Sequence, residues 1–119
     1  CKSCKTEQEV QPEYLRKIGF PEEHIGKSPV YHGVGCEECR GLGYQGQTGI
    51  HELLILTEGI RSLILNRSAA STIAQLAVEQ GMRSLRHDGW EKVLKGETTI
   101  EEVMRVTQTE EHLGLIEEN

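Results

Sequence analysis

Cys36-Glu37-Glu38-Cys39 has the same spacing as Cys1-Lys2-Ser3-Cys4, and the 31 residues 5–35 separate these two Cys-x-x-Cys turns. In each turn the backbone curls so that both sulfurs face one point, and two turns can therefore surround one ion. Four thiolates in a tetrahedron are a ligand set that zinc accepts, and they leave no open position for water or substrate. The spacing predicts one structural zinc ion held by Cys1, Cys4, Cys36 and Cys39.

Four cysteines also fit other roles. A secreted disulfide framework would use an even number, but the paired spacing matches metal ligation better and indicates a reducing cytoplasm. A thioredoxin-like dithiol normally begins a helix in a βαβ setting, which this sequence lacks, and the iron–sulfur runs of ferredoxins are spaced differently. Reduced, buried cysteines rarely form two such pairs. His32 lies close to Cys36, but four cysteines already complete the shell, so we expect its side chain to be solvated or hydrogen-bonded.

The composition indicates a small domain with an aliphatic core. Of the 119 residues, 36% are hydrophobic, and only one Phe, one Trp and three Tyr are present. Such a chain forms one domain with a modest core or two small subdomains. The net charge of −6 and the few aromatic residues argue against a nucleic-acid partner, which would need a basic face with exposed aromatics. No apolar run approaches the roughly 20 residues of a membrane helix, so we expect no direct membrane insertion.

The first half of the chain predicts short elements. Pro12 and Gly19 bound a short helix, residues 20–26 suit a further helical turn, and residues 30–32 suit an extended run. Four glycines within residues 41–49 indicate turns and close backbone approaches. They lead into the apolar run Ile50-His51-Glu52-Leu53-Leu54-Ile55-Leu56, which we interpret as a strand.

Four helices are predicted after this run. The first has Thr57 as its N-cap and ends near residues 66–67. The second begins at Ser68 and stops at Gly81, and the third extends from Met82 to Gly96. Two overlapping capping boxes within residues 98–102 begin the fourth.

These elements predict an α+β, mostly helical fold class, with a zinc-bound tetracysteine subdomain that has short strands, followed by a small bundle of short helices. We expect residues 1–46 to form the tetracysteine zinc-binding subdomain. Residues 47–107 would form a small helical C-terminal domain that begins with a strand, and residues 108–119 an acidic, disordered tail.

Known catalytic motifs are missing from the sequence. It has no G-x-x-x-x-G-K-[ST] phosphate loop, no H-E-x-x-H and no nucleophile elbow, so we expect no catalytic residue in this chain. A charged cluster suits a partner contact or an intersubunit salt bridge, but such a cluster is more often a solvated helix face. Its members are Arg83, Arg86, His87 and Asp88.

Several blocks of the sequence, in the same order, resemble the C-terminal region of type II secretion ATPases, a family of hexameric motors. The likeness covers the chain from Cys1 to about Thr107. The usual Gly-Arg-Thr-Gly of the family is replaced by Gly46-Gln47-Thr48-Gly49. The blocks are Cys1-x-x-Cys4, Gly35-Cys36-x-x-Cys39, Gly43-Tyr44-Gln45-Gly46-Gln47-Thr48-Gly49-Ile50-His51-Glu52-Leu53-Leu54, Leu85-Arg86-x-Asp88-Gly89-Trp90-x-Lys92-Val93 and Gly96-x-Thr98-Thr99-Ile100-Glu101-Glu102-Val103-Met104-Arg105-Val106-Thr107.

The resemblance implies a role within a larger parent protein. That parent would hydrolyse ATP with Mg²⁺ in the cytoplasm, beneath the inner membrane, and power assembly of a pseudopilus. Its nucleotide-binding motifs would lie upstream of this region, and its partners would be the other subunits of the hexamer and the inner-membrane platform proteins. Zinc would then present residues 5–35 as a contact platform.

Two alternatives stay open. Type IV pilus extension ATPases carry a closely similar tetracysteine region, although His51-Glu52-Leu53-Leu54 and Arg86-His87-Asp88-Gly89 look more like the secretion branch. Residues 36–43 also resemble the Cys-x-x-Cys-x-Gly-x-Gly repeat of the J-domain chaperones, which would make the chain a stand-alone zinc module that binds polypeptides. That family has four such repeats, and this chain has one.

Overall fold

A computed structural model describes residues 1–107 of the chain. Within this range the fold is mostly helical with one short two-stranded sheet, which confirms the predicted fold class. The expected tail, residues 108–119, lies outside the described residues. In order, the elements are β1 (Lys5–Gln8), α1 (Pro12–Lys17), the 3-10 turn η1 (Glu22–His24), β2 (Val30–Gly33), α2 (Glu58–Leu65), α3 (Ala70–Glu79), α4 (Leu85–Leu94) and α5 (Ile100–Val106).

The sheet joins the two ends of the segment between the cysteine pairs. β1 follows the first pair and runs antiparallel to β2, which precedes the second, with Lys5 opposite Gly33. The ladder is prolonged toward the cysteines by a hydrogen bond from the Val34 amide to the Cys4 carbonyl, at 3.3 Å. At the end of β2, the backbone of Gly33 lies close to that of Gly43. A Cβ atom at Gly33 would lie 2.1 Å from the carbonyl oxygen of Gly43, so only glycine permits this close backbone contact.

One hydrophobic core connects this segment to the last two helices. α1 and η1 form as predicted, and residues 15–20 turn their apolar side chains toward α4. The ring of Phe20 meets Trp90 edge to face, with centroids 5.5 Å apart. The core therefore draws on residues from both sides of residue 46. Its buried members are Leu15, Ile18, Phe20, Val30, Trp90, Val93, Ile100 and Val103.

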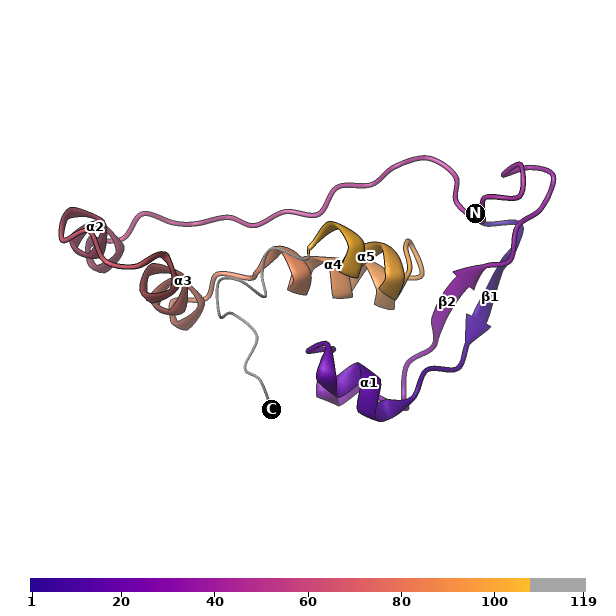
Figure 1. Ribbon diagram of the computed structural model, residues 1–119, viewed down its shortest axis with the longest axis horizontal. Coiled ribbons are helices and arrows are strands. Elements are labelled where there is room, and N and C mark those ends of the chain that lie inside the picture. The colour runs from indigo at the N-terminus through magenta and orange to yellow at the C-terminus, as the bar shows by residue number, and fades with distance from the viewer. Residues whose placement is uncertain (108–119) are drawn as a thin grey trace.

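The four predicted helices are present, and they pack as two pairs, α2 with α3 and α4 with α5 (Figure 1). Thr57 caps α2 as predicted, because its hydroxyl accepts the amide of Ile60. The predicted starts of α3 and α4 are wrong by a few residues. α3 follows Ala69, which offers no side-chain cap, and α4 follows Ser84, whose hydroxyl accepts the His87 amide.

The predicted strand at residues 50–56 is wrong for the described part of the chain. The backbone is extended there, but no strand within residues 1–107 lies beside it to form a ladder. In Figure 1 the chain runs as a long line from the cysteine end of the molecule to α2, and this segment is the part of that line that leads into α2. Among residues 1–107, no helix is long and apolar enough to cross a membrane.

Substitution of Gly89 tests how closely α4 packs against α5. Alanine in place of a helical glycine usually stabilises by about 1 kcal/mol, but here the added Cβ would lie 2.6 Å from Cγ1 of the buried Val103. We expect Gly89→Ala to lower the free energy of unfolding by about 1–3 kcal/mol, through overpacking. Urea denaturation followed by the fluorescence of Trp90 measures this.

The matched control is Gly59→Ala in α2. Its nearest neighbour would be Cδ2 of Leu76 at 3.2 Å, the end of a flexible side chain. This variant should keep or raise the free energy of unfolding, by up to about 1 kcal/mol. Equal stability of the Gly89→Ala variant and the unsubstituted chain would contradict the close contact between α4 and α5.

Candidate metal centre

The structure brings together the sulfur atoms of all four cysteines. Their Sγ atoms all lie within 4.8 Å of one another, and none is in a disulfide. The separations are 3.8 Å between Cys1 and Cys36, 3.9 Å between Cys4 and Cys39, and 3.7 Å between Cys36 and Cys39. Four sulfurs bound at about 2.3 Å to one tetrahedral ion would be about 3.8 Å apart. The cluster therefore fits a four-thiolate metal site.

Local backbone geometry forms each turn of the cluster. In the first, the amides of Cys4 and Lys5 both donate to the carbonyl of Cys1. In the second, Arg40 and Gly41 both have positive φ, 55° and 79°, and the Gly41 amide donates to the Cys36 carbonyl at 2.9 Å. This left-handed step reverses the chain immediately after the last cysteine, so the Gly43 amide points back at the Cys39 sulfur.

Cys39 is the most strongly polarised thiol of the cluster. The amides of Cys36 and Gly43 donate to its sulfur, at 3.3 and 3.2 Å. The Cys36 amide is the largest cause that lowers the pKa of Cys39 from 9.0 to about 6, against the opposing effect of burial. Because these amides favour the thiolate, the protein itself prepares this position for a cation.

Cys4 is affected in the opposite sense. Burial is the main cause that raises the pKa of its thiol, and it outweighs a backbone hydrogen bond from Gly35. A buried thiolate without a counter-charge is costly, and a bound cation removes that cost. The donor set thus holds two buried sulfurs, those of Cys4 and Cys39, and two partly exposed ones, those of Cys1 and Cys36.

His32 takes no part in the cluster. It lies on β2, half-buried, and its Nδ1 is buried with no hydrogen-bond partner within residues 1–107, so the expected hydrogen bond or solvation is not present at this ring nitrogen. The four cysteines are the one group of three or more His, Cys, Asp or Glu side chains in the described range whose geometry suits a metal ion.

Three polar contacts tie the cysteine end to the end of α4 and the beginning of α5, and no sequence pattern predicts them. The hydroxyl of Tyr44 lies 2.6 Å from Oγ1 of Thr99, the N-cap of α5. Nζ of Lys5 donates to the carbonyl of Gly96 at 3.2 Å and also lies over the ring of Tyr31. Farther along β1, Nε2 of Gln8 donates to the carboxylate of Glu101.

The charged cluster of α4 is not simply a solvated helix face. Arg86 is only 3% exposed, and its Nε and Nη2 donate to the hydroxyl and the carbonyl of Thr107, at 2.9 and 2.8 Å. Arg86 lies three residues before Gly89, beside the apolar stripe of α4, which is the signal that could have indicated its burial. Arg83 pairs with Glu91 on the exposed side of the helix.

Comparison with known proteins identifies one family. The family described as "Type II/IV secretion system protein" matches residues 1–105. The type IV pilus assembly ATPase PilB of Thermus thermophilus is 44% identical over 107 residues, which make up 90% of this chain and 12% of that protein. PilB of Pseudomonas aeruginosa is 40% identical over 108 residues, covering 91% of this chain and 19% of that protein.

A protein of the secretion branch is comparably similar. The type II secretion system protein E of Aeromonas hydrophila is 38% identical over 108 residues, which cover 91% of this chain and 21% of that protein. The chain therefore spans from 12% to 21% of the length of these relatives.

The hydroxyl of Tyr44 offers a test of the contact between the cysteine end and α5. Tyr44→Phe removes the bond to Thr99 and keeps the ring, so we expect the free energy of unfolding to fall by about 1 kcal/mol. Denaturant titration measures the loss. Tyr31→Phe is the control, because within residues 1–107 the Tyr31 hydroxyl has no hydrogen bond. An equal effect of the two substitutions would count against the tie.

Proposed function

The chain belongs to the family of type II/IV secretion system proteins, and from this premise we propose that it is the metal-binding C-terminal region of an ATPase that assembles a pilus-like filament. The family match along residues 1–105 carries the proposal. The resemblance to secretion ATPases is confirmed at the level of this family, whose members include PilB proteins and protein E.

Zinc is the ion that we propose for the cysteine cluster, with Cys1, Cys4, Cys36 and Cys39 as its ligands. The sulfur separations and the pure thiolate donor set suit zinc in tetrahedral coordination. Bound there, the ion would act as a structural cross-link with no open position for a reaction. The chain's own contributions are the amides that polarise Cys39 and the β1–β2 pairing that aligns the two turns.

The chain itself would supply structure and protein contacts. In this proposal the parent binds ATP and Mg²⁺ through residues upstream of this region, works as a hexamer in the cytoplasm, and meets platform proteins at the inner membrane. Residues 1–46 would be the zinc-binding subdomain and residues 47–107 the helical one. No residue of the chain would be catalytic.

The filament that the parent builds has two candidates. His51-Glu52-Leu53-Leu54 and Arg86-His87-Asp88-Gly89 look like the secretion branch, which makes a type II pseudopilus the first candidate. The 44% and 40% identity to two PilB proteins favours a type IV pilus as the second. Deletion of the gene in its source organism separates them, because loss of exported enzymes indicates the first and loss of surface pili the second.

Zinc content tests the metal site directly. We expect one zinc per chain, and we expect chelation to remove helical and sheet signal in circular dichroism, because metal binding and folding are coupled at structural sites. Since residues 15–30 share a core with Trp90, the emission of that single Trp should also shift to longer wavelength. A chain without metal and with an unchanged spectrum would leave the cysteines to redox chemistry or simple burial.

Cys36→Ser with Cys39→Ser in the full-length parent tests the contact role. Loss of two of four ligands should abolish zinc retention and the export or pilus phenotype, while binding of nucleotide by the upstream part persists. The control pair is Ser3→Ala with Glu38→Ala, two exposed residues within the same turns whose side chains contact each other and not the sulfurs. A folded, metal-free parent that still works would refute the role.

A further inference from the structure

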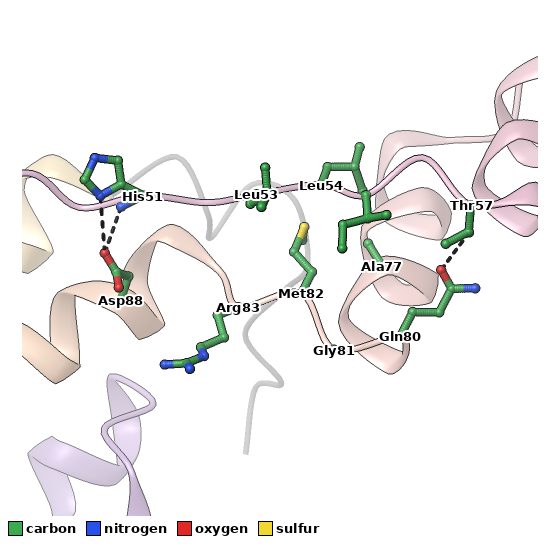
Figure 2. A pocket seen from close by; sticks show the side chains of 11 residues that line it. His51, Leu53, Leu54, Thr57, Ala77, Gln80, Gly81, Met82, Arg83 and Asp88 are labelled. Atoms are coloured by element: carbon green, nitrogen blue, oxygen red, sulfur yellow. Dashed lines mark hydrogen bonds and ion pairs between the residues drawn. The ribbon is translucent and has the colours of Figure 1, made fainter.

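Residues 50–56, here called the linking segment, are held at both ends by the chain itself. At one end the His51 amide donates to Oδ2 of Asp88, and the Leu85 amide donates to Oε2 of Glu52, both at 2.8 Å. At the other end Thr57 caps α2, and its hydroxyl donates to Oε1 of Gln80 at 2.8 Å. Figure 2 shows the segment stretched between these two attachments.

Between the attachments the segment is apolar and uncovered. Leu53, Leu54, Ile55 and Leu56 are 75%, 46%, 70% and 53% exposed. The exposure alternates with a period of two, as in a strand whose successive side chains point to opposite faces. Four consecutive large apolar residues left in water are unfavourable, since burying one such side chain is worth about 1.5–3 kcal/mol. Both faces of the segment therefore require a cover.

The backbone of the segment is also largely unpaired. Within residues 1–107, one backbone–backbone hydrogen bond involves residues 50–56, from the Thr57 amide to the Ile55 carbonyl, and the His51 amide is bound by the carboxylate of Asp88. An extended chain with free N–H and C=O groups on both sides is a template for pairing with another strand on either side. Apolar on both faces and open on both edges, the segment has the character of an interior strand of a sheet.

The chain's own helices cover one side only in part. A pocket of about 420 Å³ lies between the linking segment and the connection from α3 to α4. In Figure 2 the side chain of Met82 points from that connection toward the segment, with Ala77 and Gly81 beside it. This wall is narrow, and Leu53 and Ile55 stay exposed despite it. The remaining cover has to come from outside residues 1–107.

We propose that the linking segment is a β-strand of a sheet in the part of the parent polypeptide that lies outside this chain, with strands paired to both of its edges and layers packed on both faces. This inference rests on the proposed function, in which the parent is several times longer, as are the relatives. A second copy of this chain fits less well, because symmetric pairing of two segments would satisfy only one edge of each.

Hydrogen exchange in the full-length parent, read by mass spectrometry, tests the strand. The amides of residues 53–56 should exchange at least about 100-fold more slowly than in an unstructured peptide, because ladder hydrogen bonds in a covered sheet open rarely. Exchange at the unstructured rate would overturn the proposal. Protection that appears in the 119-residue chain alone and rises with its concentration, together with dimer formation in sedimentation, would overturn it in favour of a second copy.

A pair of substitutions tests burial of the side chains. Leu53→Gln with Ile55→Gln should lower the melting temperature of the parent by at least about 5 °C, but leave that of the 119-residue chain unchanged. Leu42→Gln is the matched control, because Leu42, outside the linking segment and the α2–α3 pair, is 73% exposed and Leu53 is 75% exposed. Equal melting of the double variant and the unsubstituted parent, or an equal drop with Leu42→Gln, would refute a specific strand.

ATP hydrolysis and zinc content, measured on the same parent sample, separate this inference from the proposed function. A protected segment in a parent that neither hydrolyses ATP nor binds zinc supports the strand and refutes the motor. Rapid exchange in an active, zinc-loaded parent refutes the strand and leaves the motor standing.

Discussion

The meeting of two cysteine pairs across 31 intervening residues is the constraint on which the first half of the structure depends. A two-stranded sheet is marginal in water by itself, so β1 and β2 gain their stability from what closes them at either end. At the cysteine end of the sheet, the sulfur cluster brings the two strands together. At the other end, α1 packs on α4. A metal ion bound by the four sulfurs would hold the ends of this loop together, which would limit the entropy of the unfolded chain and favour the compact arrangement.

The same constraint reaches the second half of the chain through the shared core. Phe20 and Trp90 come from opposite sides of the glycine-rich stretch, yet their rings are in contact. Tyr44 and Lys5 add hydrogen bonds to the start of α5 and the end of α4. Loss of order at the cysteines would therefore destabilise α4 and α5 as well, because residues 15–30 share their core with these helices.

Local signals in the sequence were sufficient where one residue fixes a helix end. Thr57 caps α2 as predicted, Thr99 of the two overlapping capping boxes caps α5, and Pro12 starts α1. The cysteine cluster was predictable for a similar reason, because each pair is a local turn. The start of α3 was not, since Ala69 offers no capping side chain and packing against α2 decides where the helix begins.

The remaining errors concern residues whose state depends on distant parts of the chain. Burial of Arg86 depends on Thr107, which is 21 residues away and offers two oxygens in the right places. For residues 50–56 the apolar pattern predicts a strand, but a strand exists only where a neighbour completes its ladder. The pattern described the chemistry of the segment correctly, and the described residues lack the neighbour.

The two ends of the molecule thus differ in the contacts that stabilise them (Figure 1). α2 and α3 have only 8 and 10 residues, and helices of this length are marginal in water unless one face is buried. Their pair buries Ile60 and Ala77 but leaves Ile64, Leu65 and Val78 largely exposed. Since these helices share no buried core with α4 and α5 within residues 1–107, we expect further stability to come from apolar contacts beyond the described residues. A linking segment buried in a neighbouring sheet would supply that support, because it is joined directly to the N-cap of α2.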